Sequence, residues 1–204
     1  MVRTGNVDSG VILPPDLTGA GLRRAVHYLE KQLADFAPIA LRNPRGFASV
    51  VRNFGVKALA KYAGYEKVRY AHTAQQHFPD LRRRGSGQKP SPNESLESKA
   101  SKRPWAIQSH YDHPGWYVVW RYLVDDTQSL EPGKPVIIWR VDVVFLEKAD
   151  WKYGKSRAGD AGGGRTHTFG VKNPAQKLKN AAVYRRKDVA IRDGKPVPAN
   201  GGQD

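Results

Sequence analysis

The chain has 204 residues, no cysteine and a formal net charge of +15, with 34 lysines and arginines against 19 aspartates and glutamates. The lack of cysteine excludes disulfides, thiolate zinc sites and a cysteine nucleophile, and no run of about 18 apolar residues predicts a membrane span. So large a basic excess predicts a polyanionic partner such as nucleic acid, and we expect one domain that resides in the cytoplasm.

The positive charge lies in segments that flank a slightly acidic middle. Residues 22–72 carry ten bases and three acids, residues 81–103 carry seven and two, and residues 151–187 carry ten and one. Residues 104–150 instead carry four bases and seven acids. This distribution indicates a cationic rim that contacts phosphates around a centre with another task.

A polar arm (1–16) is followed by a helical part (17–78) that opens a single predicted domain (17–192). The first apolar stripe predicts a helix that ends before a proline at position 38; it consists of Leu22, Val26, Leu29, Leu33 and Phe36. A second helix begins at Asn43 and Pro44 and continues until Gly64, with the stripe Phe47, Val51, Phe54 and Ala58. Residues 66–78 fit either a third helix or a connector.

The remainder of the domain (79–192) predicts a β-sheet. Residues 81–103 are rich in Gly, Pro, Ser and Asn, which is typical of a loop. Residues 116–124 and 136–146 are β-branched and aromatic, and predict a hairpin with a long connection.

The last part of the chain predicts one more strand and one more helix. A glycine cluster precedes the strand at 165–171, and Asn173 and Pro174 begin a helix that ends in the cationic run 185–187. The tail, 193–204, is expected to be disordered. The order of elements predicts an α/β (α+β) fold, with a helical N-terminal segment and a mixed central β-sheet flanked by helices.

Asp80, Glu97 and Lys99 form the constellation that could carry chemistry. An aspartate and a glutamate from adjacent strands can bind Mg²⁺ and leave coordination positions for a phosphate oxygen and a water. A lysine two residues beyond the glutamate shares its face of the strand, where it can stabilise phosphate charge or help to deprotonate the water. Ser98 would then point to the opposite face.

Two other acid–any–lysine triplets compete with this one. Asp150 and Lys152 have Asp142 as an upstream acid, but one continuous strand puts those two carboxylates about 26 Å apart, too far to share an ion. Asp193 and Lys195 lie in the predicted tail. Between Asp80 and Glu97, by contrast, several turn-forming residues let the chain double back: Gly85, Gly87, Pro90, Pro92 and Asn93.

The segments HFPD (77–80) and LESKASKRPW (96–105), with the aromatic strands beyond them, resemble the PD-(D/E)XK nuclease fold of many type II restriction endonucleases. The resemblance covers residues 66–150. It implies a magnesium-dependent site that cleaves double-stranded DNA, with Asp80 and Glu97 as metal ligands and Lys99 as the catalytic lysine. Because each chain would carry one site, it also implies a homodimer.

A second polar cluster, residues 109–115, contains His110, Asp112 and His113. It is similar to the His-x-His-x-Asp-His zinc motif of the metallo-β-lactamase fold, but Gln108 takes the place of the first ligand. The alternatives are a polar turn before a strand, or a second tier of the nuclease site in which either histidine contacts phosphate or positions water.

Basic residues beside the loop and after the glycine cluster are the candidate contacts to DNA. They are Arg82, Arg83, Arg84, Lys102, Arg103, Arg165 and His167. For Arg165 and His167 an ordinary exposed strand is the alternative.

The tryptophans divide into two groups. Trp120 and Trp139 sit in apolar strands and are expected in the core, whereas Trp105 and Trp116 could stack on bases. The competing function is a non-catalytic DNA- or RNA-binding module, in which residues 81–103 are a flexible basic loop and the aromatic sheet is a binding platform or merely the core.

Overall fold

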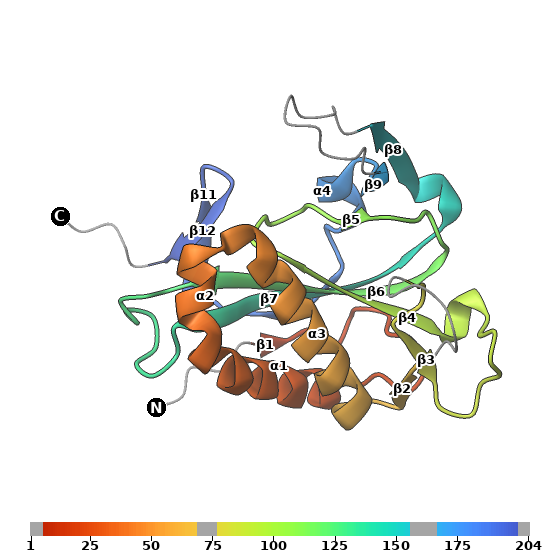
Figure 1. Ribbon diagram of the computed structural model, residues 1–204, viewed down its shortest axis with the longest axis horizontal. Coiled ribbons are helices and arrows are strands. Elements are labelled where there is room, and N and C mark those ends of the chain that lie inside the picture. The colour runs from red at the N-terminus through yellow and green to blue at the C-terminus, as the bar shows by residue number, and fades with distance from the viewer. Residues whose placement is uncertain (1–5, 69–76, 156–166, 200–204) are drawn as a thin grey trace.

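The computed structural model describes residues 6–68, 77–155 and 167–199. Within these ranges a seven-stranded mixed sheet runs through the centre of the molecule in the order β1-β10-β7-β6-β4-β3-β2 (Figure 1). Helices α1 and α3 lie together across one face of the sheet (Figure 1). The predicted α/β architecture, with a mixed sheet flanked by helices, is therefore confirmed.

The central sheet has a parallel pair at its middle. Strands β4 and β6 run parallel, while all other neighbouring pairs in this sheet are antiparallel. The predicted hairpin is confirmed as β6 and β7, which pair over their whole length. The strands are β1 (Asn6–Val7), β2 (Tyr65–Lys67), β3 (Leu81–Arg83), β4 (Ser95–Ser101), β6 (Gly115–Val124), β7 (Val136–Leu146) and β10 (Ala182–Arg185).

Both predicted helices are present, as α1 (Gly19–Leu33) and α3 (Pro44–Tyr62). A 3₁₀ turn (Ala34–Phe36) and the short helix α2 (Ala37–Arg42) connect them. Pro38 does not stop the chain from being helical, because it lies in the first turn of α2, where a backbone N–H has no helical acceptor to lose. Among the described residues, no helix combines the length and apolar character needed to cross a bilayer.

The apolar stripes of α1 and α3 pack against the central sheet as one large core. Gly55 lets α3 approach the sheet closely, because a Cβ there would lie 2.2 Å from Nε1 of the buried Trp120 and 2.8 Å from Oγ of Ser98. Trp120 and Trp139 are fully buried, as predicted. The close packing fixes the height of α3 above β4, which matters for the site below.

Residues 81–103 are not simply a loop. Their ends form β3 and β4, and a connection with a 3₁₀ turn (Pro92–Glu94) joins them. The two leucines that the segment contains, Leu81 and Leu96, pair across the two strands and are fully buried. Two buried apolar residues in register are enough to anchor this polar segment in the sheet, which the overall composition could not indicate.

The opposite face carries a smaller sheet, β5 (Gln108–Ser109), β9 (His167–Val171) and β8 (Trp151–Lys155), with one helical turn, α4 (Pro174–Lys177). The predicted strand at 165–171 is thus confirmed over 167–171. The predicted helix from 174 to 185–187 is wrong beyond its first turn. Residues 182–185 form β10 instead, because they pair with the open edge of β7 and bury Val183 in the main core.

The predicted disordered tail also contains regular structure. β11 (Val189–Arg192) and β12 (Lys195–Pro198) form a hairpin, whose turn places Asp193 and Gly194 at positive φ. Val189 is buried beside Trp139 and Leu130. That apolar contact anchors the hairpin to the edge of the molecule.

Candidate active site

Asp80 and Glu97 meet at the point where β3 separates from β4. The two strands pair only at Leu81 with Leu96 and at Arg82 with Ser95. Beyond this pair the backbone N–H of Asp80 donates to Oε2 of Glu97 at 2.9 Å, and the N–H of Ser98 donates to Oδ2 of Asp80 at 3.1 Å. The Asp80 carboxylate therefore takes the place of a neighbouring strand along the free edge of β4.

Glu97 and Lys99 share one face of β4. Nζ of Lys99 lies 2.8 Å from Oε1 of Glu97, and both side chains are largely buried. Ser98 points to the other face, as predicted, where its Oγ accepts a hydrogen bond from Nε1 of Trp120 at 3.0 Å and donates to the carbonyl oxygen of Arg52 at 3.3 Å. The three candidate catalytic residues therefore converge, although they are spread over 20 positions of the sequence.

A fourth side chain, Arg52 of α3, belongs to this cluster and was missed by the sequence interpretation. Its Nε donates to Oδ2 of Asp80 at 3.2 Å, its Nη2 pairs with Oδ1 of Asp80, and the same Nη2 lies 3.7 Å from Oε1 of Glu97. Arg52 stands next to the apolar stripe of its helix, so it could be expected near the sheet. No spacing in the sequence connects it with Asp80.

The electrostatics of the cluster are nearly balanced, with two carboxylates facing two cations. Burial raises the pKa of Glu97 and the charge of Asp80 raises it further, which outweighs the lowering by Lys99 and Arg52. Burial lowers the pKa of Arg52, but Asp80 and Glu97 more than compensate and the pKa lies above its ordinary value. The two carboxylates therefore favour a positive charge beside them, which Arg52 and Lys99 supply.

The donor atoms fit a hard divalent cation. A single nitrogen of Arg52 contacts Asp80 and lies near Glu97, so one positive centre can be shared by oxygens of both carboxylates. Within the described ranges no group of three or more His, Cys, Asp or Glu side chains is arranged to hold a metal ion. At this site the protein would thus contribute two oxygen ligands, and Mg²⁺ commonly completes its shell with waters and phosphate oxygens.

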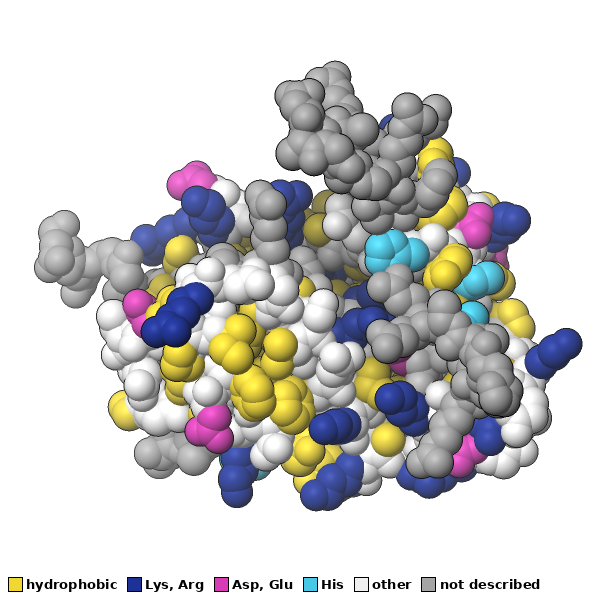
Figure 2. All heavy atoms as spheres, in the orientation of Figure 1, with side chains coloured by type: hydrophobic (Ala, Val, Ile, Leu, Met, Phe, Trp, Pro, Cys, Tyr) yellow, Lys and Arg dark blue, Asp and Glu magenta, His cyan; other side chains and the backbone are white. Residues whose placement is uncertain are grey.

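The cluster opens into a cavity of about 280 Å³ between the first turns of α3, the free edge of β4 and strand β9. A second hollow continues from it, sharing Ala48, Lys99, Ala100 and Gln108, and reaches Lys102 and Arg103. We call the two together the trough. Figure 2 shows basic side chains in the middle of this face, with histidines beside them.

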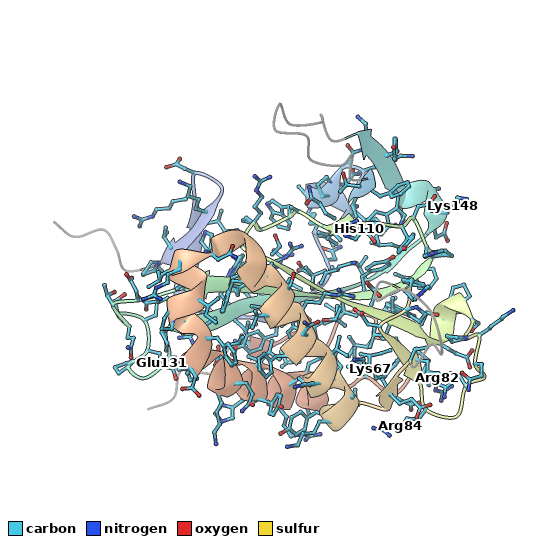
Figure 3. All side chains as sticks on the ribbon, in the orientation of Figure 1. Lys67, Arg82, Arg84, His110, Glu131 and Lys148 are labelled. Atoms are coloured by element: carbon cyan, nitrogen blue, oxygen red, sulfur yellow. The ribbon has the colours of Figure 1, made fainter. Side chains whose placement is uncertain are left out.

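His110 lies at the rim of the cavity, across from α3 (Figure 3). His113 does not line the cavity: its ring packs against Phe78 and Tyr111, with ring centroids 5.0 and 5.2 Å apart, and its carbonyl oxygen accepts from the Tyr117 hydroxyl. Of the two candidate histidines, only His110 is therefore placed where it could contact a substrate bound to Lys99.

The candidate DNA contacts divide into two groups. Lys102 and Arg103 line the trough. Arg82, Arg83 and Arg84 do not line the trough, and each has a partner within the protein: Glu66 at 2.8 Å, Asp16 at 2.6 Å and the Ala60 carbonyl oxygen at 2.7 Å. Arg82 and Arg84 lie with Lys67 at the β2–β3 edge, well away from His110 (Figure 3). Arg82 thus joins β3 to β2, Arg83 joins this edge to the segment before α1, and Arg84 joins it to α3.

The other candidate contacts to nucleic acid are two basic residues after the glycine cluster and two tryptophans. Arg165 lies outside the described residues, and His167 begins β9, where its backbone pairs with that of Lys155. Trp105 stacks on the guanidinium of Arg140 at 4.4 Å, and Trp116 packs edge-on against Phe145 at 5.3 Å. Both tryptophans thus pack against neighbouring side chains of the protein.

The competing triplet does not come together. Asp142 is fully buried between Arg121 and Arg140, while Asp150 pairs with Lys177 at 2.8 Å. These carboxylates serve separate ion pairs on the face opposite α3. The single continuous strand expected from Asp142 to Asp150 is wrong, because β7 ends at Leu146 and Asp150 lies in a 3₁₀ turn (Lys148–Asp150).

Comparison of this chain with protein-family models, with curated proteins and with solved structures gave no match.

Proposed function

We propose that this protein is a magnesium-dependent endonuclease that hydrolyses phosphodiester bonds of double-stranded DNA, as restriction enzymes do. The observation that carries the proposal is the convergence of Asp80, Glu97 and Lys99 at the separated ends of β3 and β4. A merely structural ion pair does not require a free strand edge beside a cavity, whereas a substrate phosphate does. The strong basic excess supports a polyanionic substrate.

Each side chain has a role that follows from its position. Asp80 and Glu97 would hold Mg²⁺, which when bound supplies charge neutralisation at the phosphate and a more acidic water. Lys99 would hold the phosphate or the attacking water beside Glu97, because its ammonium group points into the cavity from the same strand face. The Glu97 and Lys99 side chains are only 5% and 14% exposed, which limits their movement and so preserves this geometry.

The trough supplies a path for the DNA backbone. Lys99 lies in β4, and Lys102 and Arg103 lie in the bend that follows the end of this strand at Ser101, along the same trough. Lys102 and Arg103 would therefore contact phosphates next to the one that is cut. Cleavage of both strands would take two copies of the site, so we propose that the active form is a homodimer acting in the cytoplasm.

The test is incubation of the purified protein with supercoiled plasmid and MgCl₂, followed by separation of nicked and linear products. We expect cleavage by the wild type that EDTA abolishes, and a loss of roughly 10²-fold or more in rate for Glu97→Gln and for Lys99→Met. The exposed Lys89, which lies in the connection between β3 and β4, gives a matched control, Lys89→Met, which should cleave as the wild type does.

A non-catalytic nucleic-acid-binding module is the second candidate, because Arg52 and Lys99 already neutralise both carboxylates as a structural ion-pair cluster would. Binding of DNA or RNA without cleavage under any metal condition would favour this function. Cleavage that persists in both Glu97→Gln and Lys99→Met would refute the assignment of the site.

A further inference from the structure

We propose that Arg52 is an internal counter-cation, which holds Asp80 and Glu97 together in the absence of metal and moves to the substrate phosphate when metal binds. Binding of metal and of DNA would then be cooperative, with Arg52 as the coupling residue. This inference rests on the proposed function and adds a substrate-binding residue that the sequence patterns did not predict.

The first step is competition for the same atoms. Arg52 uses both oxygens of Asp80 and approaches Oε1 of Glu97, so its guanidinium occupies the side of the carboxylates that faces the cavity. A divalent ion needs these oxygen lone pairs and would stand next to a fixed positive charge if Arg52 stayed. Binding of the ion therefore requires the guanidinium to leave.

The second step is that the side chain can move while its helix cannot. The carbonyl oxygen of Arg52 accepts from Ser98 Oγ, and Gly55, one turn later, packs directly on Trp120. These contacts hold α3 at the height of β4. The Arg52 side chain is 31% exposed and lines the cavity of about 280 Å³, so a rotation of its torsion angles would carry the guanidinium from the carboxylates to a phosphate bound there.

The third step is the balance of charge. Without metal, two cations offset two carboxylates. A divalent ion would leave the cluster with two excess positive charges, which a phosphodiester and a deprotonated water would offset. The released guanidinium is a planar donor that suits two phosphate oxygens at once. Bound metal thus releases the guanidinium that contacts the DNA phosphate, and the bound phosphate offsets the positive charge that the metal adds. This reciprocal effect on the two affinities is a coupling free energy.

The coupling can be measured without catalysis, with Ca²⁺ as the metal probe. Isothermal titration calorimetry would give the Ca²⁺ affinity of the wild type and of Arg52→Gln, each alone and with a short DNA duplex. We expect Arg52→Gln to bind Ca²⁺ roughly tenfold more tightly than the wild type when no DNA is present. In the wild type DNA should tighten Ca²⁺ binding by a similar factor, whereas in the variant DNA should have little effect.

Two further variants make the result specific. Arg52→Lys keeps the charge but loses the bidentate contact with the Asp80 carboxylate. It should bind Ca²⁺ with an affinity between those of the wild type and Arg52→Gln. Lys57→Gln removes an exposed cation from the same helix and should leave both the affinity and its dependence on DNA unchanged. Circular dichroism and the unfolding temperature would verify that each variant is folded.

The outcomes separate this inference from the proposed function. If the wild type binds Ca²⁺ and cleaves DNA with Mg²⁺, but folded Arg52→Gln and Arg52→Lys bind Ca²⁺ no more tightly than the wild type, the role of Arg52 is refuted and the nuclease remains. If the wild type binds no divalent ion and cuts no DNA, both proposals fail together. Tighter binding in Arg52→Gln with loss of the DNA effect supports the coupling.

Discussion

Replacement of Asp142 by asparagine would test how the protein balances the most deeply buried charges among its described residues. Asp142 is fully buried, with Oδ2 2.8 Å from Nε of Arg121 and Oδ1 paired with Nε of Arg140. The side chains of Arg121 and Arg140 are themselves 0% and 3% exposed. Burial lowers the pKa of Arg121 and the charge of Arg140 lowers it further, so that its pKa stays below the ordinary value despite Asp142.

Asp142→Asn would leave two buried cations without an anion. Breaking a buried ion pair in this way typically destabilises a protein by about 3–5 kcal/mol, and the amide oxygen of asparagine can still accept one hydrogen bond, which favours the lower end. For a chain of this size each kcal/mol lowers the unfolding temperature by about 2–4 °C. We therefore expect a loss of roughly 3 kcal/mol and a decrease of about 6–12 °C.

Urea denaturation followed by tryptophan fluorescence, and thermal unfolding followed by circular dichroism, would measure the change. Asp126→Asn is the control, because Asp126 is exposed in the β6–β7 loop and should change the free energy of unfolding by less than about 0.5 kcal/mol. A loss of less than about 1 kcal/mol for Asp142→Asn would contradict the reasoning, since it would mean that the two arginines do not depend on this carboxylate. The same variant should also loosen the segment that lines the trough, because Arg121 donates hydrogen bonds to the carbonyl oxygens of Arg103 and Ala106.

Three further changes test other parts of the structure. Gly55→Ala should destabilise the protein by about 1–3 kcal/mol in thermal unfolding and slow cleavage, because the new Cβ would collide with the buried Trp120 and displace α3. Asp125→Ala should cost about 1–3 kcal/mol in urea denaturation at pH 7, because this carboxylate accepts hydrogen bonds from the β6–β7 loop. Burial raises the pKa of Asp125 but those hydrogen bonds lower it more, so the stabilisation is complete above its ordinary pKa of 3.8 and is lost as the pH falls through the lower folded value. Alanine at both Lys102 and Arg103 should weaken DNA binding and reduce the slope of log affinity against log salt concentration by about two, measured by fluorescence anisotropy.

Each of these predictions has a matched control. Gly87→Ala should be neutral, because nothing lies within 4 Å of a Cβ at that position. The difference between wild type and Asp125→Ala should shrink below pH 3.8, and an unchanged difference at low pH would contradict its electrostatic origin. Lys31→Ala removes an exposed cation on α1 and should leave the salt slope unchanged. An unaltered slope in the Lys102 and Arg103 double variant would remove the trough from the DNA path.

Elements built on local patterns could be predicted from the sequence. The stripes from Leu22 to Phe36 and from Phe47 to Ala58 repeat at helical spacing. This spacing is set by residues close together in the sequence, so it can be recognised without knowledge of the rest of the fold. The β6–β7 hairpin was equally accessible, because its β-branched and aromatic runs are long and adjacent in the chain. The acidic pair with Lys99 could be predicted as a candidate because the turn-forming residues between Asp80 and Glu97 allow the chain to double back.

Features that depend on contacts between distant segments could not be read from the chain. Residues 182–185 form a strand because the edge of β7 is open, and Arg82, Arg83 and Arg84 have partners in Glu66, Asp16 and α3. Arg52 reaches Asp80 across 28 positions only because α3 packs closely on β4 and Trp120. Local periodicity thus reveals which face of an element is buried, whereas the neighbour it is buried against, and hence the full composition of the site, follows from the packing of the whole chain.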